Sequence, residues 1–226
     1  MAARPGVKLS VIVPCLDEAS IIVDALLALA PLRDAGHEVI VVDGGSADGT
    51  VERAQGACER VLAAPRGRAS QMNAGARAAT GEALLFLHAD TRLPAGAERL
   101  IASALRERAW GRFDVAIEGR QPLLRVVAAS MNLRSRVTGI ATGDQAIFVR
   151  REAFEGFPPI ALMEDIGFSK RMRRRSRPAC LRARVRTSGR RWESRGVLRA
   201  ILLMWRLRLL YFLGAAPERL ERLYRA

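Results

Sequence analysis

The feature that most constrains the fold is a regular alternation of short apolar runs with stretches of helical periodicity between Leu9 and Asp90. The apolar runs are rich in valine, isoleucine and leucine and predict buried strands, whereas the stretches between them carry apolar residues three or four positions apart. The predicted strands span residues 9–14, 38–42, 60–63 and 83–87, and the predicted helices span residues 18–32, 50–57 and 68–79. Strands that alternate with helices predict an α/β fold with a mostly parallel, doubly wound sheet.

The alternation becomes looser beyond residue 95. Further strands are predicted at residues 110–118, 145–150 and 181–187, and further helices at residues 95–108, 122–138, 164–175, 197–213 and 217–224. The 226 residues suit a single domain with a sizeable core, and no internal repeat or low-complexity linker divides them. We therefore predict one domain over residues 1–190. A basic helical extension over residues 191–226 is expected to pack on that domain or on a membrane surface.

Polar residues follow three of the predicted strands directly. They lie at residues 15–18, 43–46 and 88–90. Because the carboxyl ends of parallel strands meet at one edge of a sheet, these loops are expected to lie close together. The sequence therefore predicts a ligand site at that edge.

Asp43 ends one of these strands and precedes a Gly-Gly turn, so its carboxylate suits a hydrogen bond to a nucleobase N–H or a ribose hydroxyl. The alternative is a local role in the turn. For that role Ser46 and Asp48 are better placed in the sequence, because Asp48 precedes a predicted helix.

Asp90 follows the very apolar strand over residues 83–87, where a carboxylate suits a hard divalent cation and leaves coordination sites for a diphosphate. The alternative is a helix N-cap, which Thr91 could also provide. His88 is a second candidate ligand, although a lone histidine is more often packed or hydrogen-bonded.

Two further groups have both a structural and a functional interpretation. Glu164 and Asp165 begin a predicted helix that ends in basic residues, which suits the helix dipole, and either carboxylate could also deprotonate an acceptor hydroxyl. Arg66 and Arg68, with Gln71 and Asn73 one turn later, form either an anion-binding helix start or a solvated loop and polar helix face.

In this order, the motifs resemble those of the inverting family 2 glycosyltransferases of the GT-A fold. They are Ser10-Val-Ile-Val-Pro14 with Asp17-Glu18, Val41-Val-Asp-Gly-Gly-Ser-Ala-Asp-Gly-Thr50, Asn73-Ala-Gly75, Phe86-Leu-His-Ala-Asp90 and Glu164-Asp165. The resemblance covers residues 9–175 and makes the 1–190 domain a GT-A glycosyltransferase domain.

The resemblance implies roles for individual residues. Asp165, beside Glu164, would be the catalytic base, and Asp90, with His88 as a candidate partner, would hold a divalent cation, Mn²⁺ or Mg²⁺. The residues expected at the nucleotide-sugar donor are Pro14, Glu18, Asp43, Gly45, Arg68, Asn73 and Ala89. The donor would be a UDP- or GDP-sugar, from which a hexose passes to an acceptor hydroxyl.

Two positions depart from the family pattern. Residue 88 is histidine where the family usually has aspartate, and Gly44 stands where a second acid or an asparagine is common. The chain resembles most a small bacterial subgroup that carries His-Ala-Asp together with Gly143-Asp144-Gln145 and a late Arg191-Trp192.

The alternatives rest mainly on composition. The net charge of +14 comes almost entirely from arginine, which fits either the codon bias of a GC-rich genome or attraction to anions. A nucleic-acid-binding module is not expected, because the basic stretch over residues 171–191 lacks the interleaved aromatic residues used for base stacking. A nucleotidyltransferase would need a glycine-rich loop ending in lysine, which residues 14–18 lack. A catalytically degenerate nucleotide-binding protein is a further alternative because of His88.

The helix over residues 197–213 bears on location and partners. It is strongly apolar, yet Arg206 and Arg208 interrupt it too closely for a membrane span. It either covers the sheet or forms a dimer contact, or it lies in a membrane interface with Trp205 and Tyr211 inserted. Three scattered cysteines suit a reducing compartment. We therefore expect a cytoplasmic protein that is attached peripherally to the membrane. The acceptor is left open, and a lipid is one candidate.

Overall fold

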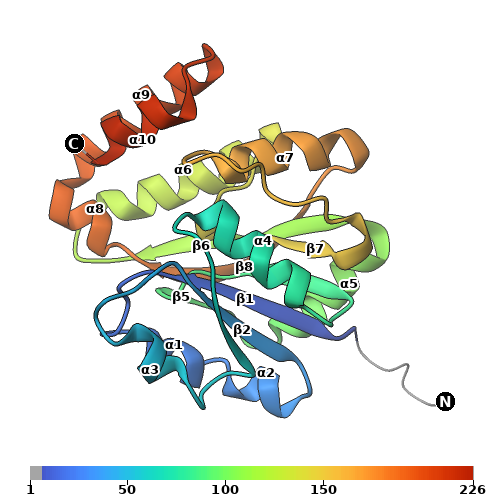
Figure 1. The fold of residues 1–226 in the computed structure, drawn as a ribbon. Coiled ribbons are helices and arrows are strands. Elements are labelled where there is room, and N and C mark those ends of the chain that lie inside the picture. The colour runs from blue at the N-terminus through green and yellow to red at the C-terminus, as the bar shows by residue number, and fades with distance from the viewer. Residues whose placement is uncertain (1–6, 226) are drawn as a thin grey trace.

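The computed structural model describes residues 7–225, except for the side chains of Arg191, Arg195 and Arg225. Eight strands form one sheet in the order β3-β2-β1-β4-β7-β6-β8-β5 (Figure 1). Their bounds are β1 Leu9–Cys15, β2 Glu38–Asp43, β3 Arg60–Ala63, β4 Ala83–Phe86, β5 Thr91–Arg92, β6 Trp110–Glu118, β7 Phe148–Arg150 and β8 Ala179–Ser188. The predicted α/β fold is confirmed, and each predicted strand is present with ends that differ by a few residues at most.

The sheet is mixed rather than parallel throughout. Strands β3, β2, β1 and β4 are parallel, as expected from their alternation with helices, and β6 is parallel to β8. Strand β7 is antiparallel to both β4 and β6, and β5 is antiparallel to β8. The doubly wound description therefore holds for the first four strands only.

Ten α-helices and two 3₁₀ turns lie within the described residues. The helices are α1 Ile22–Leu27, α2 Ala30–Asp34, α3 Thr50–Ala54, α4 Arg68–Ala78, α5 Ala97–Glu107, α6 Leu123–Thr138, α7 Glu164–Arg175, α8 Arg190–Arg195, α9 Val197–Phe212 and α10 Pro217–Arg225; the 3₁₀ turns are η1 Gly143–Gln145 and η2 Arg151–Ala153. The single helix predicted over residues 18–32 is wrong. It is two short helices, because Pro31 lacks the N–H needed inside a helix and is tolerated only in the first turn, where it lies in α2.

Helices cover both faces of the sheet, as Figure 1 shows with α4 and α7 on one side and α1, α2 and α3 on the other. Two apolar clusters fill the space between the layers. One joins the sheet to α1, α5 and α6, and the other joins it to α4 and α7 through an aromatic group. That group consists of Phe86, Trp110, Phe154, Phe157 and Phe168. The helices on both faces of the sheet therefore hold the strand ends in place, and with them the loops that follow the strands.

The last two helices, α9 and α10, extend along one end of the molecule (Figure 1). A third apolar cluster attaches them, in which Leu207 and Leu220 pack against Ile140, Met163 and Ile166. They thus contact the start of α7, where the predicted base lies. Among the residues described, no helix combines the length and apolar character needed to cross a membrane.

Candidate functional site

The loops that follow β1 and β2 are tied together by hydrogen bonds. The Asp17 amide donates to Ser46 Oγ, and the Glu18 amide donates to Thr50 Oγ1, each at 2.9 Å. Asp17 has a φ of 53°, a left-handed conformation that is uncommon for a residue other than glycine. The two loops therefore form one rigid rim at the carboxyl edge of the sheet.

Asp43 is buried at that rim and organises its own turn. Its Oδ2 accepts hydrogen bonds from the amides of Gly45 at 2.8 Å and Ser46 at 2.9 Å, and its Oδ1 accepts one from the Ser46 hydroxyl. Ser46 and Asp48 have the local roles that the sequence suggested for them, but Asp43 shares in the turn. Asp48 accepts from the Thr50 amide at 3.0 Å, at the start of α3.

Asp43 is ionised although it is buried. Burial alone would raise its pKa, but the hydrogen bonds from the Ser46 hydroxyl and from the amides of Ser46 and Gly45 outweigh burial and lower it. The neighbouring Cys15 responds in the opposite way, since burial and the charge of Asp43 raise the pKa of its thiol to about 12. The rim thus presents a fixed negative charge next to a neutral thiol.

Three other residues predicted at the donor lie at the same edge. Pro14 is in register with Val42, one position before Asp43, and Gly45 has a φ of 92°, which favours glycine. The Glu18 carboxylate lies 3.5 Å from Nη2 of Arg190, at the start of α8. Sequence reasoning missed Arg190, although it precedes the Arg-Trp pair of residues 191 and 192. The side chain of Arg191 lies outside the described residues.

Helix α4 is fastened closely to the sheet beneath these loops. Gln71 Nε2 donates to the carbonyl oxygens of Cys15 at 2.7 Å and Val42 at 2.8 Å. A Cβ on Gly75 would lie only 2.5 Å from Ile12 Cγ2, so glycine is required at this approach. The glycine of the Asn-Ala-Gly motif is therefore a packing residue.

Asn73 has a use other than the one predicted. Its Nδ2 donates to the Phe157 carbonyl at 2.9 Å, and its Oδ1 accepts from the Phe157 amide at 2.7 Å. Both ends of the amide group therefore hold the segment before α7. The structure does not bring this side chain together with the loops after β1 and β2.

The His-Ala-Asp segment follows β4, with Ala89 buried and His88 and Asp90 partly exposed. His88 Nδ1 lies 3.3 Å from Asp144 Oδ1 in η1. The other edge of the ring faces Gly143, where an added Cβ would lie 2.7 Å from His88 Nε2. Both ring nitrogens therefore lie against the turn 143–144.

The Asp90 carboxylate makes only weak hydrogen bonds. Its Oδ1 lies 3.4 Å from Thr91 Oγ1 and 3.5 Å from Thr187 Oγ1, which are long hydrogen bonds. Within the part of the chain that the structure describes, no three histidine, cysteine, aspartate or glutamate side chains gather as a metal site. The Asp90 carboxylate, which makes only these long contacts, can contribute an oxygen ligand to a cation.

The turn 143–144 also contacts the predicted base. The Gly143 amide donates to Asp165 Oδ2 at 3.0 Å, and Asp165 Oδ1 accepts from the Ile166 amide at 2.7 Å. Asp165 is partly exposed, whereas Glu164 is only 6% exposed. The backbone thus orients the Asp165 carboxylate and leaves it accessible.

Glu164 and Arg68 influence each other electrostatically. Burial and then the charge of Asp165 raise the pKa of Glu164 to about 7, although Arg68 opposes the rise. Arg68 is exposed at the first turn of α4. Burial would lower its pKa, but the charges of Glu164, Asp144 and Asp165 raise it. Arg68 therefore interacts electrostatically with the predicted catalytic base, a link that the sequence analysis did not foresee.

A polar network that sequence reasoning missed supports the turn from behind. Gln145 is fully buried, accepts from the Thr142 amide at 3.2 Å, and donates to Asn132 Oδ1 at 3.3 Å. Asn132, on α6, also exchanges two hydrogen bonds of 2.9 Å with the backbone of Val115 in β6. In the Gly-Asp-Gln motif, glycine permits the approach of His88, aspartate contacts its ring, and glutamine anchors the turn.

The fold has counterparts among known proteins. Glucosyl-3-phosphoglycerate synthase from Mycobacterium tuberculosis, solved with Mn²⁺, UDP and glucosyl-3-phosphoglycerate, has a TM-score of 0.57 at 20% identity over 79% of this chain and 71% of its own. The mannosyltransferase PcManGT from Pyrobaculum calidifontis, solved with GDP-Man and Mn²⁺, has a TM-score of 0.63 at 22% identity over 98% and 70%.

S. aureus TarS 1–349, solved with UDP, has a TM-score of 0.63 at 23% identity over 80% of this chain, which spans 60% of the TarS chain. These similarities establish the shared GT-A fold. Among curated proteins, none matches the sequence significantly.

The family follows from the sequence itself. The model of Glycosyl transferase family 2 matches residues 10–157, which include the loops after β1, β2 and β4. The match extends over more than half of the chain. The protein therefore belongs to glycosyltransferase family 2 and is a glycosyltransferase.

Proposed function

We propose that the protein transfers a hexose from a UDP- or GDP-sugar to a hydroxyl acceptor, with inversion at the anomeric carbon. The observation that carries this proposal is the double link made by the turn 143–144. Asp144 contacts His88 of the His-Ala-Asp segment, and Gly143 donates to Asp165. The candidate cation site and the candidate base are thereby held by one short segment, as a single displacement requires.

The donor would lie against the rim formed by the loops after β1 and β2. Asp43 is buried, ionised and fixed by its turn, so it suits an N–H of uracil or guanine. Glu18, Pro14, Gly45 and Ala89 line the same edge in this proposal, and Arg68 is close enough to Glu164 and Asp165 to contact the diphosphate. Complexes with UDP and with GDP-Man among the structural neighbours support a donor of this class.

A divalent cation, Mn²⁺ or Mg²⁺, fits the chemistry of Asp90. The carboxylate is partly exposed and makes only long contacts to two hydroxyls, so an oxygen ligand is available. When bound, the cation would neutralise charge that develops on the departing nucleoside diphosphate. Because both nitrogens of His88 lie against the turn 143–144, we assign His88 to positioning that turn.

In the proposed step, Asp165 takes the proton of the acceptor hydroxyl while that oxygen bonds to the anomeric carbon. The bond from this carbon to the diphosphate oxygen breaks at the same time, and Arg68 stabilises the negative charge that appears there. The pKa of Glu164 is raised to about 7, so this carboxyl is about half protonated at pH 7 and increasingly neutral below it, which reduces its repulsion of the reacting groups. Asp165 is therefore the more suitable base of the two.

A thermal-shift screen of UDP-, GDP- and dTDP-sugars, each with and without Mn²⁺ or Mg²⁺, tests the proposal. A recognised donor raises the melting temperature by mass action, and more so with the cation. The same protein incubated with that donor should release nucleoside diphosphate in the presence of the acceptor. Failure of every nucleotide sugar to shift the melting temperature would contradict the donor assignment.

We also propose that the protein works at the cytoplasmic face of a membrane, which suits a lipid-linked acceptor. Six large apolar side chains of α9 and the residue after it are exposed, between 59% and 74%. They are Leu198, Leu202, Trp205, Leu209, Phe212 and Leu213. Their spacing places them along one side of the helix, as in helices that lie in the membrane interface.

A further inference from the structure

In two partly buried arginines, some guanidinium nitrogens have no hydrogen-bond partner among the described residues. These arginines are Arg134 on α6 and Arg208 on α9. Nε and Nη2 of Arg134 and Nε of Arg208 are shielded from solvent, and the described chain offers them no hydrogen-bond acceptor. A buried N–H of a charged group is costly when it is left without an acceptor. Such a group is expected to meet its partner in a ligand.

The two arginines lie on helices that pack against each other, and both interact electrostatically with the proposed base. Burial and then the positive charge of Arg208 lower the pKa of Arg134 to about 10, although Asp165 and Asp144 act in the opposite direction. For Arg208, burial lowers the pKa, and Asp165 and Asp144 again oppose the effect. Two like charges are therefore held within electrostatic reach of each other, which an anion between them would relieve.

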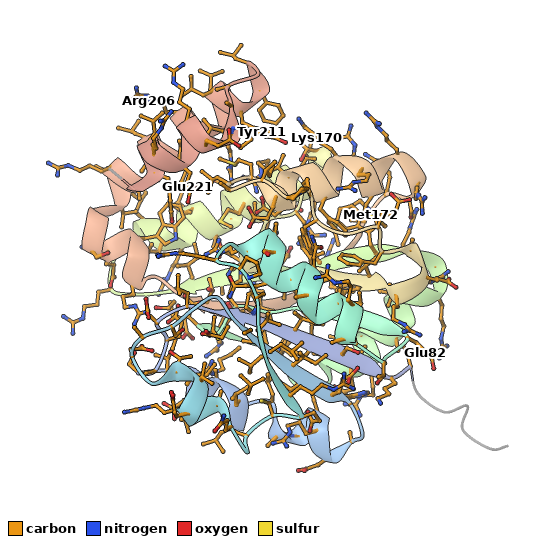
Figure 2. All side chains as sticks on the ribbon, viewed as in Figure 1. Glu82, Lys170, Met172, Arg206, Tyr211 and Glu221 are labelled. Carbon is orange, nitrogen blue, oxygen red and sulfur yellow. The ribbon has the colours of Figure 1, made fainter. Side chains whose placement is uncertain are left out.

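The elements that carry the pair keep it in place. Helix α9 packs against α6, and it is fixed by a cluster in which Leu207, next to Arg208, is fully buried against Ile140 and Ile166. On α9, Tyr211 lies one turn beyond Arg208 and packs beside Lys170 of α7, whose Nζ is 4.8 Å from the Tyr211 ring centre. Figure 2 shows Tyr211 and Lys170 together between α9 and α7, with Arg206 on the outer side of α9.

We propose that Arg134 and Arg208 form a subsite for a phosphate group of the acceptor, beside Asp165. The inference rests on the proposed function and names the acceptor class, a hydroxyl compound that carries a phosphate monoester. Two guanidinium groups match the charge of a phosphate dianion, and their unpartnered N–H groups match its oxygens. The phosphate could belong to a soluble metabolite or to a lipid headgroup.

The first experiment measures inorganic phosphate binding by thermal shift in EDTA, without donor, so that it does not depend on transfer. Wild type should gain melting temperature with millimolar phosphate, and Arg134→Gln and Arg208→Gln should each weaken this response at least about tenfold. Arg125→Gln on α6 and Arg206→Gln on α9, both exposed, are matched controls that should keep it. Unchanged phosphate binding by both Arg134→Gln and Arg208→Gln would overturn the subsite, as would its loss in Arg68→Gln alone.

If a glutamine variant does not fold, a crystal of the wild type grown with tungstate replaces the measurement. A tungsten peak within hydrogen-bonding distance of Arg134 Nε and Arg208 Nε supports the subsite. A peak elsewhere only, or none, overturns it.

A second experiment distinguishes the two sources of the phosphate. With a soluble source, glycerol 3-phosphate should shift the melting temperature of wild type and not of Arg208→Gln. With a lipid source, Arg208→Gln should lose flotation on phosphatidic acid vesicles and keep it on phosphatidylglycerol vesicles.

The subsite and the proposed function can fail separately. If the protein binds phosphate through these arginines but transfers no sugar, the proposed function fails while the subsite stands. If transfer occurs and Arg134→Gln leaves the KM for a phosphorylated acceptor unchanged, the subsite fails alone.

Discussion

His88 Nδ1 lies 3.3 Å from Asp144 Oδ1, and the same imidazole blocks the space above Gly143. The ring is only 12% exposed, so the turn 143–144 and the end of β4 are fitted to each other. The Gly143 amide also donates to Asp165. His88 therefore influences the position of the candidate base through a single intervening residue, Gly143. Histidine thus has a structural role at position 88, where aspartate is usual, because its ring packs against the turn 143–144.

Gly143→Ala should disrupt this fit. The new Cβ would lie 2.7 Å from His88 Nε2, and overpacking of this kind costs about 1–3 kcal/mol. We expect lower stability and at least a tenfold loss of transfer. In Gly143→Ala/His88→Ala the clash is absent, so the double variant should be more stable than Gly143→Ala alone. Urea denaturation of the four proteins in this cycle measures the coupling, and additive effects would show that the ring and the turn are independent.

Asp90→Ala is expected to abolish turnover and the part of nucleotide binding that depends on Mn²⁺ or Mg²⁺. The reason is that Asp90 is the carboxylate available at the end of β4, with only long contacts to Thr91 and Thr187. His88→Ala should reduce activity less, because His88 acts through the turn 143–144. Titration of UDP or GDP with and without Mn²⁺ checks the prediction. An Asp90→Ala protein with wild-type cation dependence would show that the cation binds elsewhere.

Asp165→Asn should bind the donor normally and transfer about 10²–10⁴-fold more slowly, which is the usual contribution of a general base. The asparagine retains the oxygen that accepts from the Gly143 amide, so the turn should stay in place. Donor affinity from thermal shift and transfer rate from nucleotide release separate binding from catalysis. Substantial transfer by Asp165→Asn would move the base role to Glu164 or away from the pair.

Glu164→Gln should change how stability depends on pH. Burial raises the pKa of Glu164 from 4.5 to about 7, so the folded state holds this proton more tightly than the unfolded state. That contribution is complete below about pH 4.5 and is lost as the pH rises to about 7. Glu164→Gln should therefore exceed wild type in stability at pH 8, by roughly 1–3 kcal/mol, and match it near pH 4.

Urea denaturation at both pH values tests this expectation. Glu107→Gln, at an exposed position of α5, controls for the removal of one carboxylate. Equal effects of Glu164→Gln at pH 4 and pH 8 would contradict the raised pKa.

Much of the fold could be predicted because strand and helix periodicities are local properties of the sequence. The strand β6 over Trp110–Glu118 and the alternating face of β8 follow directly from such patterns. The antiparallel setting of β7 could not be predicted, because strand direction depends on where α6 and η1 lead the chain. The break between α1 and α2 was visible in Pro31 and was missed.

The site was predictable where one strand end carries one functional group. Asp43 ends β2 and Asp90 follows β4, so both lie at the carboxyl edge of the sheet as expected. The pairing of Arg134 with Arg208 was not predicted. The two residues lie on helices that are far apart in the sequence, and no local pattern marks them. Asn73 illustrates the opposite case, since a motif residue proves to be bonded to Phe157 in the folded chain.

We expected Trp205 and Tyr211 to share the inserted face of α9, and for Tyr211 this is wrong. It packs beside Lys170, because it lies on the side of the helix that faces α7. Trp205 is 68% exposed and lies in the apolar stripe with Leu202 and Leu209.

Vesicle flotation should therefore show binding to anionic vesicles at low salt that weakens as salt increases, because arginines flank the stripe. Trp205→Ser/Leu209→Ser should abolish binding, because it removes apolar side chains that would enter the interface. Leu27→Ser, which removes an equally exposed leucine on α1, should leave binding intact. If the stripe is a dimer contact instead, sedimentation would show a dimer that Trp205→Ser/Leu209→Ser dissociates. Wild-type protein that stays at the bottom of the gradient at low salt, with anionic vesicles present, would rule out membrane attachment through α9.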